Sequence, residues 1–221
     1  MLPELRGPST LVVVRRAGVS LLVIGIVGQL GWLAELVLTT HVSPLHTVIS
    51  GLAAPGEPYA VVFRTMEVAS GVAFVLSVPP MLRLAPVQRR ARLTILMVGL
   101  LGVAYVLRGA FPIECVHDGS GVCTPDPALT PGGYINFAAS MLVSLLCAAG
   151  PIGLLLWWYG RWTVAPMTGI VVGTLSWIVL VLDGLLGPGI FAGLASRAQM
   201  VGASIVLGAG AVYLARTARV G

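Results

Sequence analysis

The chain has 221 residues, of which 57% are hydrophobic and only 10% are charged, and its mean hydropathy is +0.97. This composition lies outside the range of soluble proteins and predicts an all-α membrane protein with one domain. The net charge is +5, but orientation in the membrane and contact with anionic lipid account for it, so no nucleic-acid partner is expected. Because the sequence has no lysine, retinal proteins and other Schiff-base chemistries are excluded.

Six apolar stretches are long enough to cross a hydrocarbon core about 30 Å thick, which requires ~20 residues per helix. The first follows Arg15 and Arg16 and is longer than the core of a signal peptide, so it is expected to stay as a helix. In chain order the predicted helices are Val19–Leu38, Ala60–Leu82, Leu93–Phe111, Tyr134–Trp158, Val164–Leu186 and Phe191–Leu214.

The arginines predict the orientation of these helices. Basic residues favour the cytoplasmic side, and ten of the thirteen arginines lie beside alternate helix ends. Both termini are therefore expected in the cytoplasm of a multi-pass cell-membrane protein. The long connections His41–Tyr59 and Pro112–Gly133 contain no arginine and are expected outside. The ten arginines are Arg6, Arg15, Arg16, Arg83, Arg89, Arg90, Arg92, Arg161, Arg216 and Arg219.

Six charged residues lie inside the apolar stretches, where ionisable groups are costly and usually mark a cavity or pathway. At a rise of about 1.5 Å per residue, all six fall in the outer leaflet of the predicted topology. Arg64 and Glu67 are three residues apart on one helical face and are expected to pair. The set comprises Arg64, Arg108, Arg197, Glu35, Glu67 and Asp183.

Polar and aromatic side chains extend this charged set. Asn136, Ser140 and Ser144 recur every four residues, which predicts a helical stripe facing protein or water. Trp32, Tyr105 and Phe137 are candidates to line the same space. Together these residues predict a polar chamber that opens outward, although the same polar and charged side chains also fit a purely structural role in helix packing.

The two long connections carry separate signals. Cys115 and Cys123 are close in the chain with glycines between them, which favours a disulfide, while a zinc site and free thiols remain alternatives. The first connection contains the apolar run Leu45–Leu52, which predicts a short helix on the membrane surface. No resident metal and no cofactor are expected, since no nucleotide, haem or zinc-hydrolase motif is present.

Three segments resemble a known family: ISGLAAPGEPYAVVFRTMEVASGVAF, FPIECVHDGSGVC and GLASRAQMVGASIVLGAGAVYLART. They are similar to the actinobacterial branch of the membrane family catalogued as domain of unknown function 998. The resemblance spans most of the chain and implies six helices and an outer cysteine loop, with no settled activity. Members often have a histidine at the start of the fourth helix, where this chain has Asn136.

Three functions fit these observations. The chain is similar in size and character to small integral-membrane terpene cyclases, in which case Glu67 donates a proton to an isoprenoid and Asp183 is its partner or stabilises positive charge. Alternatively, the chain has a non-enzymatic binding or transport role, in which Arg64, Arg108 and Arg197 bind the anionic headgroup of a lipid or isoprenoid that arrives from the outer leaflet. In the third hypothesis the chain is an accessory subunit of an unspecified protein partner, and Glu35 and the other charges only order its helices.

Overall fold

The computed structural model describes residues 8–85, 88–113, 115–117, 123–125, 130–186 and 191–217. Within these residues, six helices are long and apolar enough to cross a membrane, which confirms the predicted all-α bundle. They are α1 (Pro8–Gln29), α2 (Ala60–Leu84), α3 (Arg89–Ala110), α4 (Pro131–Leu155), α5 (Val164–Leu186) and α6 (Ala192–Thr217). Short 3-10 helices lie at Leu30–Leu36 (η1), Ile49–Ala53 (η2) and Gly160–Thr163 (η3).

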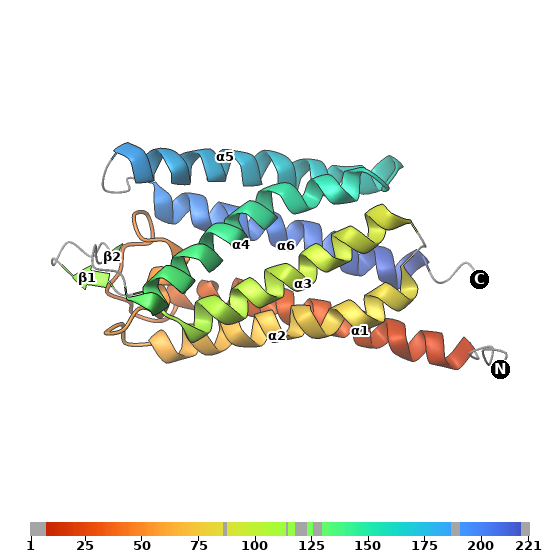
Figure 1. Cartoon of the computed structure of the whole chain (residues 1–221), viewed down its shortest axis with the longest axis horizontal. Coiled ribbons are helices and arrows are strands. Elements are labelled where there is room, and N and C mark those ends of the chain that lie inside the picture. The colour runs from red at the N-terminus through yellow and green to blue at the C-terminus, as the bar shows by residue number, and fades with distance from the viewer. Residues whose placement is uncertain are drawn as a thin grey trace.

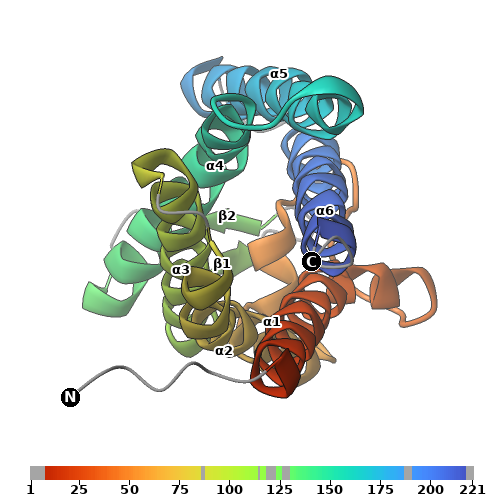
Figure 2. The same cartoon turned by 90° about the vertical axis from the view of Figure 1, so that its right-hand side faces the viewer.

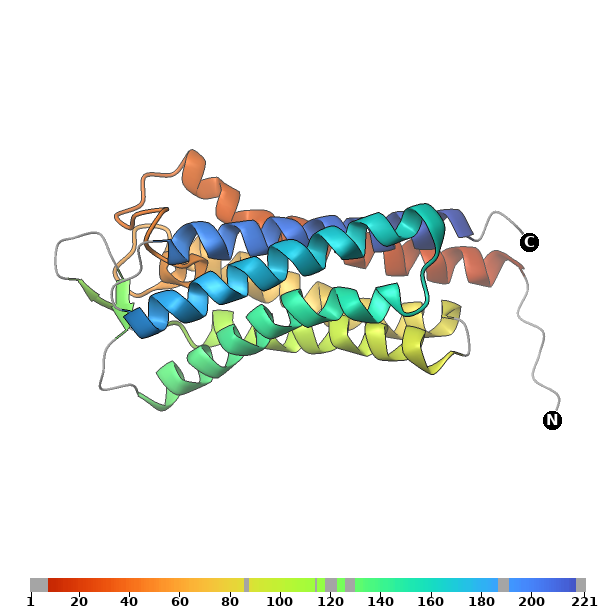
Figure 3. The same cartoon turned by 90° about the horizontal axis from the view of Figure 1, so that it is seen from above.

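The six helices form a closed ring. Consecutive helices pack side by side in chain order, and α1 also packs against α6 (Figures 1 and 2). α4 contacts α6 as well, so α5 lies on the outside of the ring. One end of the bundle, where α1 begins and α6 ends, is called the N/C end below; the opposite end carries the β-strands and is called the hairpin end (Figure 3).

Helix α1 differs most from its predicted range. It begins at Pro8 and not at Val19, because the apolar residues Leu11–Val14 continue the helix on the far side of Arg15 and Arg16. It ends at Gln29, where the chain continues as η1. Both arginines therefore lie within the helix and not in front of it.

Helices α2 and α3 approach each other most closely at two glycines. A Cβ atom added at Gly71 would lie 2.5 Å from the carbonyl oxygen of Gly102, and one at Gly102 would lie 2.6 Å from the carbonyl oxygen of Gly71. Small residues allow membrane helices this backbone contact. On α5, a Cβ added at Gly173 would likewise lie 2.9 Å from backbone atoms of α4, whereas one at Gly169 would clash with the side chain of Val206. Gly208, on α6, has no atom within 4 Å of such a Cβ.

The loop between α1 and α2, residues 37–59, folds into the hairpin end of the ring. Residues 49–54 are all buried, and η2 packs against α2 and α6. The prediction of a surface helix in Leu45–Leu52 is therefore wrong. Burial against the helices shields residues 49–52 of this run better than a membrane surface would, since it removes all sides of them from water. This loop closes the hairpin end.

A short antiparallel hairpin joins α3 and α4, formed by β1 (Cys115–His117) and β2 (Cys123–Pro125). Its register places Cys115 opposite Pro125 and Cys123 opposite His117, so the cysteines are not directly opposite each other. Their side chains lie outside the described part of the structure, and no disulfide is present among the described side chains. The disulfide stays a prediction.

The glycine contacts predict opposite effects for two alanine substitutions. Gly102→Ala should destabilise the protein by about 1–3 kcal/mol, because the new methyl group meets backbone atoms of α2. Gly208→Ala should be neutral or stabilise the protein by up to about 1 kcal/mol, because its methyl group meets open space and alanine favours the helix. Thermal unfolding in detergent measures both; equal melting temperatures for the two variants would contradict the proposed packing.

Candidate functional site

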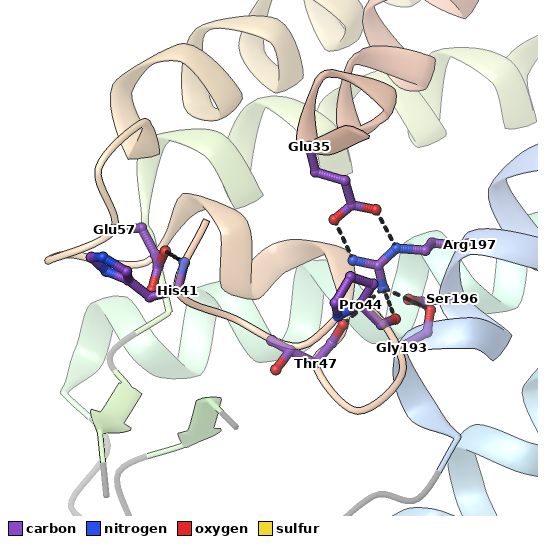
Figure 4. A network of polar contacts seen from close by, with 8 residues as sticks. All are labelled: Glu35, His41, Pro44, Thr47, Glu57, Gly193, Ser196 and Arg197. Carbon is purple, nitrogen blue, oxygen red and sulfur yellow. Dashed lines mark hydrogen bonds and ion pairs between the residues drawn. The ribbon is translucent and has the colours of Figure 1, made fainter. Parts of the chain in front are cut away.

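Arg197, on α6, joins three parts of the hairpin end (Figure 4). Its Nε and Nη2 donate to the two carboxylate oxygens of Glu35, both at 2.6 Å. Its Nη1 donates to the carbonyl oxygens of Pro44, Thr47 and Gly193 at 2.6, 3.0 and 2.9 Å. One buried guanidinium thus holds η1, the 37–59 loop and the start of α6 together. Bidentate geometry of this kind favours arginine over lysine.

Glu67 and Arg108 form a second buried ion pair. Nη2 of Arg108, on α3, donates to Oε1 of Glu67, on α2, at 2.5 Å. The side chains are 10% and 7% exposed, so water screens the pair little. The i,i+3 pair expected between Arg64 and Glu67 is not the one that forms. The carboxyl group that was expected to donate a proton is therefore engaged by Arg108.

The remaining two charges bind backbone groups. Nε of Arg64 donates to the carbonyl oxygen of Ala53 at 2.8 Å, which holds the end of η2. The carboxylate of Asp183 accepts the backbone N–H of Phe191 at 3.0 Å, which links the end of α5 to the start of α6. Asp183 is therefore not beside Glu67, and the two form no acid-base pair in this structure.

The predicted polar stripes face protein. The amide of Asn136 donates to the carbonyl oxygens of Arg108 and Phe111 at 3.0 and 2.6 Å, at the end of α3. Ser144 and Gln199 exchange hydrogen bonds between α4 and α6. These contacts satisfy buried polar groups, as membrane helices require.

Of the three predicted lining aromatics, two lie against the ion pairs. Trp32 lies 5.8 Å from the guanidinium carbon of Arg197, and Tyr105 lies 4.9 Å from that of Arg108. Phe137 is 52% exposed on the outside of α4, so it does not line an internal space. The sequence of one helical turn does not show which side of α4 faces the inside of the ring. The prediction therefore gave the Phe137 side chain the wrong direction.

The space beside these residues is small. Trp32, Glu67, Tyr105 and Arg108 line a void of about 20 Å³. A void of this size holds one water molecule and no lipid chain. The buried 37–59 loop occupies the entrance where the predicted chamber would open, because its apolar run packs inside the ring.

A much larger cavity lies at the N/C end. Its volume is about 400 Å³, within the range of about 300–1,000 Å³ typical of small-molecule pockets. Side chains from α1, α2, α3, α4 and α6 contribute to its wall, together with the segment after α4. The wall is mainly apolar; the residues used below are Arg15, Leu22, Val98, Trp157, Trp158 and Gly210.

Sequence reasoning missed this cavity. Arg15 was assigned to orientation in the membrane, and Trp157 and Trp158 match the aromatic residues found at membrane surfaces. The available signal was weak: several glycines on α6, including Gly210, leave room where other residues would fill the ring.

The two buried ion pairs predict different double-mutant cycles. Arg108→Met or Glu67→Gln alone should cost about 3–5 kcal/mol of stability, because each leaves an unpaired buried charge or polar group. The double variant should recover most of that loss.

For the second pair, the double variant Glu35→Gln/Arg197→Met should recover much less of the stability that its single variants lose. The reason is that three carbonyl oxygens also lose their donor. Free energies of unfolding in detergent give both coupling energies. Equal recovery in the two cycles would show that the carbonyl contacts contribute nothing.

Comparison with known proteins places the chain in one family. The model of the family described as "Protein of unknown function (DUF998)" matches residues 17–213, which include four complete membrane helices and most of α1 and α6. No curated protein and no solved structure matches the chain. The match covers most of the chain, and the protein belongs to the DUF998 family of membrane-type helical proteins.

Proposed function

We propose that the protein binds the hydrocarbon chain of a lipidic or isoprenoid molecule, without catalysis, in the cavity at the N/C end. The observation that carries this proposal is the cavity itself: about 400 Å³ of space inside a ring of apolar helices. Preformed apolar cavities of this volume are the usual binding sites of small molecules.

The shape of the space fits a chain. Along α3, the lining residues run from Ala91 to Val98, about 10 Å at the helical rise. A second void of about 50 Å³ shares Val98 and Leu207 with the first and continues inward to Leu101. The two together extend about 15 Å along α3, roughly half the thickness of a hydrocarbon core.

The geometry favours binding over acid-catalysed cyclisation. Glu67, the expected proton donor, is paired with Arg108 beside a void of about 20 Å³. The large cavity is lined by neither Glu67 nor Asp183, and no carboxylate is among its described lining residues. A cyclase needs an acid that touches its substrate.

The arginine pattern predicts that the N/C end lies in the cytoplasm, so we expect the ligand to enter from the inner leaflet of the cell membrane. Two exposed positions test this topology: Leu45, which is 53% exposed at the hairpin end, and Gln88, which is exposed at the N/C end. In a cysteine-free background, an impermeant maleimide should label Leu45→Cys in intact cells and Gln88→Cys only after permeabilisation. The reverse pattern would invert the topology and move the cavity to the outer leaflet.

Filling the cavity should abolish binding. Gly210 lines the cavity and has no atom within 4 Å of an added Cβ, so Gly210→Phe places a ring in the open space without a backbone clash. We expect labelling by diazirine-bearing hexadecanol, in nanodiscs of neutral lipid, to fall at least about tenfold, the effect of ~1.4 kcal/mol.

Gly208→Phe is the matched control, because Gly208 lies on the same helix with equal space but is not among the cavity-lining residues. It should label like the wild type. Hexadecanol and geranylgeraniol probes, compared side by side, distinguish acyl-like from isoprenoid chains. Undiminished labelling of Gly210→Phe would refute binding at this cavity.

A further inference from the structure

The wall of the large cavity carries hydrogen-bond donors that have no acceptor. Nη1 of Arg15 is buried, and within the described residues it has no hydrogen-bond partner. The indole Nε1 atoms of Trp157 and Trp158 are also buried without a partner. Unmatched buried donors are rare and costly, so each calls for an explanation.

Arg15 differs in this respect from the arginines around it. It lies about 10 Å along α1 from Pro8, with a half-buried side chain, whereas the neighbouring Arg16 is exposed. At the same end, Arg90 donates to the carbonyl oxygen of Leu156, and Arg161 lies 5.6 Å from the ring of Trp162. Arg15 instead borders the cavity.

No carboxylate of the described chain is available to Arg15. Seven of the eight acidic residues lie between Glu35 and Asp183 in the sequence, and the three within the membrane helices and η1 are bonded at the hairpin end. A guanidinium that borders an apolar cavity without a counter-ion is poorly solvated. An anionic group in the cavity would supply the missing partner.

The two indole groups are held in place by an aromatic cluster. The rings of Trp157 and Tyr213 lie 5.6 Å apart, and those of Trp158 and Tyr213 stack at 5.0 Å. Trp158 is only 2% exposed. Packing on this scale fixes both rings, so their N–H groups are preorganised donors of residues that line the same cavity as Arg15.

We propose that the cavity selects an amphiphile with an anionic head, a carboxylate or a phosphate monoester, which binds Arg15 and the indole donors while its hydrocarbon chain extends toward Val98. This proposal rests on the proposed function, since it assigns a head to the chain already placed there. A cationic head is disfavoured by Arg15, and a neutral head leaves the guanidinium without a counter-ion.

The experiment compares three probes with the same diazirine-bearing chain: hexadecanol, hexadecanoic acid and hexadecyl phosphate. The full-length protein is placed in nanodiscs of phosphatidylcholine, and the probes are present at equal mole fractions in the bilayer. For the wild type, at least one anionic probe should bind about tenfold more tightly than the alcohol, as expected of one charge-assisted contact. The tighter of the two anionic probes identifies the head.

Arg15→Gln should remove this preference, so that the three probes bind this variant about equally. Arg16→Gln is the matched control, because it removes the same charge one residue away on the exposed face, and it should retain the preference. Arg15→Lys keeps the cation and should retain part of the preference. Retention in this variant shows that the loss in Arg15→Gln comes from the missing charge and not from a folding defect.

The outcomes separate the two proposals. If wild-type protein binds all three probes equally, or if Arg16→Gln loses the preference as Arg15→Gln does, the anionic site is refuted and chain binding stands. If hexadecanol does not bind, or binds Gly210→Phe as well as wild type, the proposed function fails and this inference fails with it.

Discussion

The bonds of Arg197 connect the first helical segment, the 37–59 loop and the last helix. A ring of six helices has no covalent link between its first and last members, so something must close it. Glu35 and Arg197 do so with two charge-assisted hydrogen bonds of 2.6 Å. Inside a membrane, water is not available to replace lost partners, so such contacts are effectively obligatory. The remaining guanidinium donor fixes Pro44 and Thr47, which holds the loop inside the ring.

Closure of one end determines where open space remains. The loop and the Glu67–Arg108 pair fill the hairpin end and leave a void of about 20 Å³. At the N/C end no comparable loop enters the ring among the described residues, and Gly210 on α6 leaves room beside it. The cavity of about 400 Å³ is the result. The N/C end, and not the hairpin end, therefore has room for a ligand.

Hydropathy and arginine spacing were enough to predict the helices, since each helix must match the membrane thickness whatever its neighbours are. They were not enough to predict ion pairs. Arg64 and Glu67 share a helical face, yet Glu67 pairs with Arg108, because the choice depends on how α2 and α3 rotate about the Gly71–Gly102 contact. Cavities are harder still to predict, because a cavity forms only where the side chains of several helices together leave a space unfilled.

Charge pairing distinguishes the two ends of the bundle. At the hairpin end, Glu35 and Glu67 each have an arginine partner within the chain, although Oε2 of Glu67 and Nε of Arg108 are buried without a hydrogen-bond partner among the described residues. At the N/C end, Arg15 has no partner of opposite charge among the described residues, yet it borders the largest described cavity. A buried charge that the fold does not neutralise carries a cost in stability. Binding an anion there would recover that cost, and this couples occupancy of the cavity to the stability of the bundle.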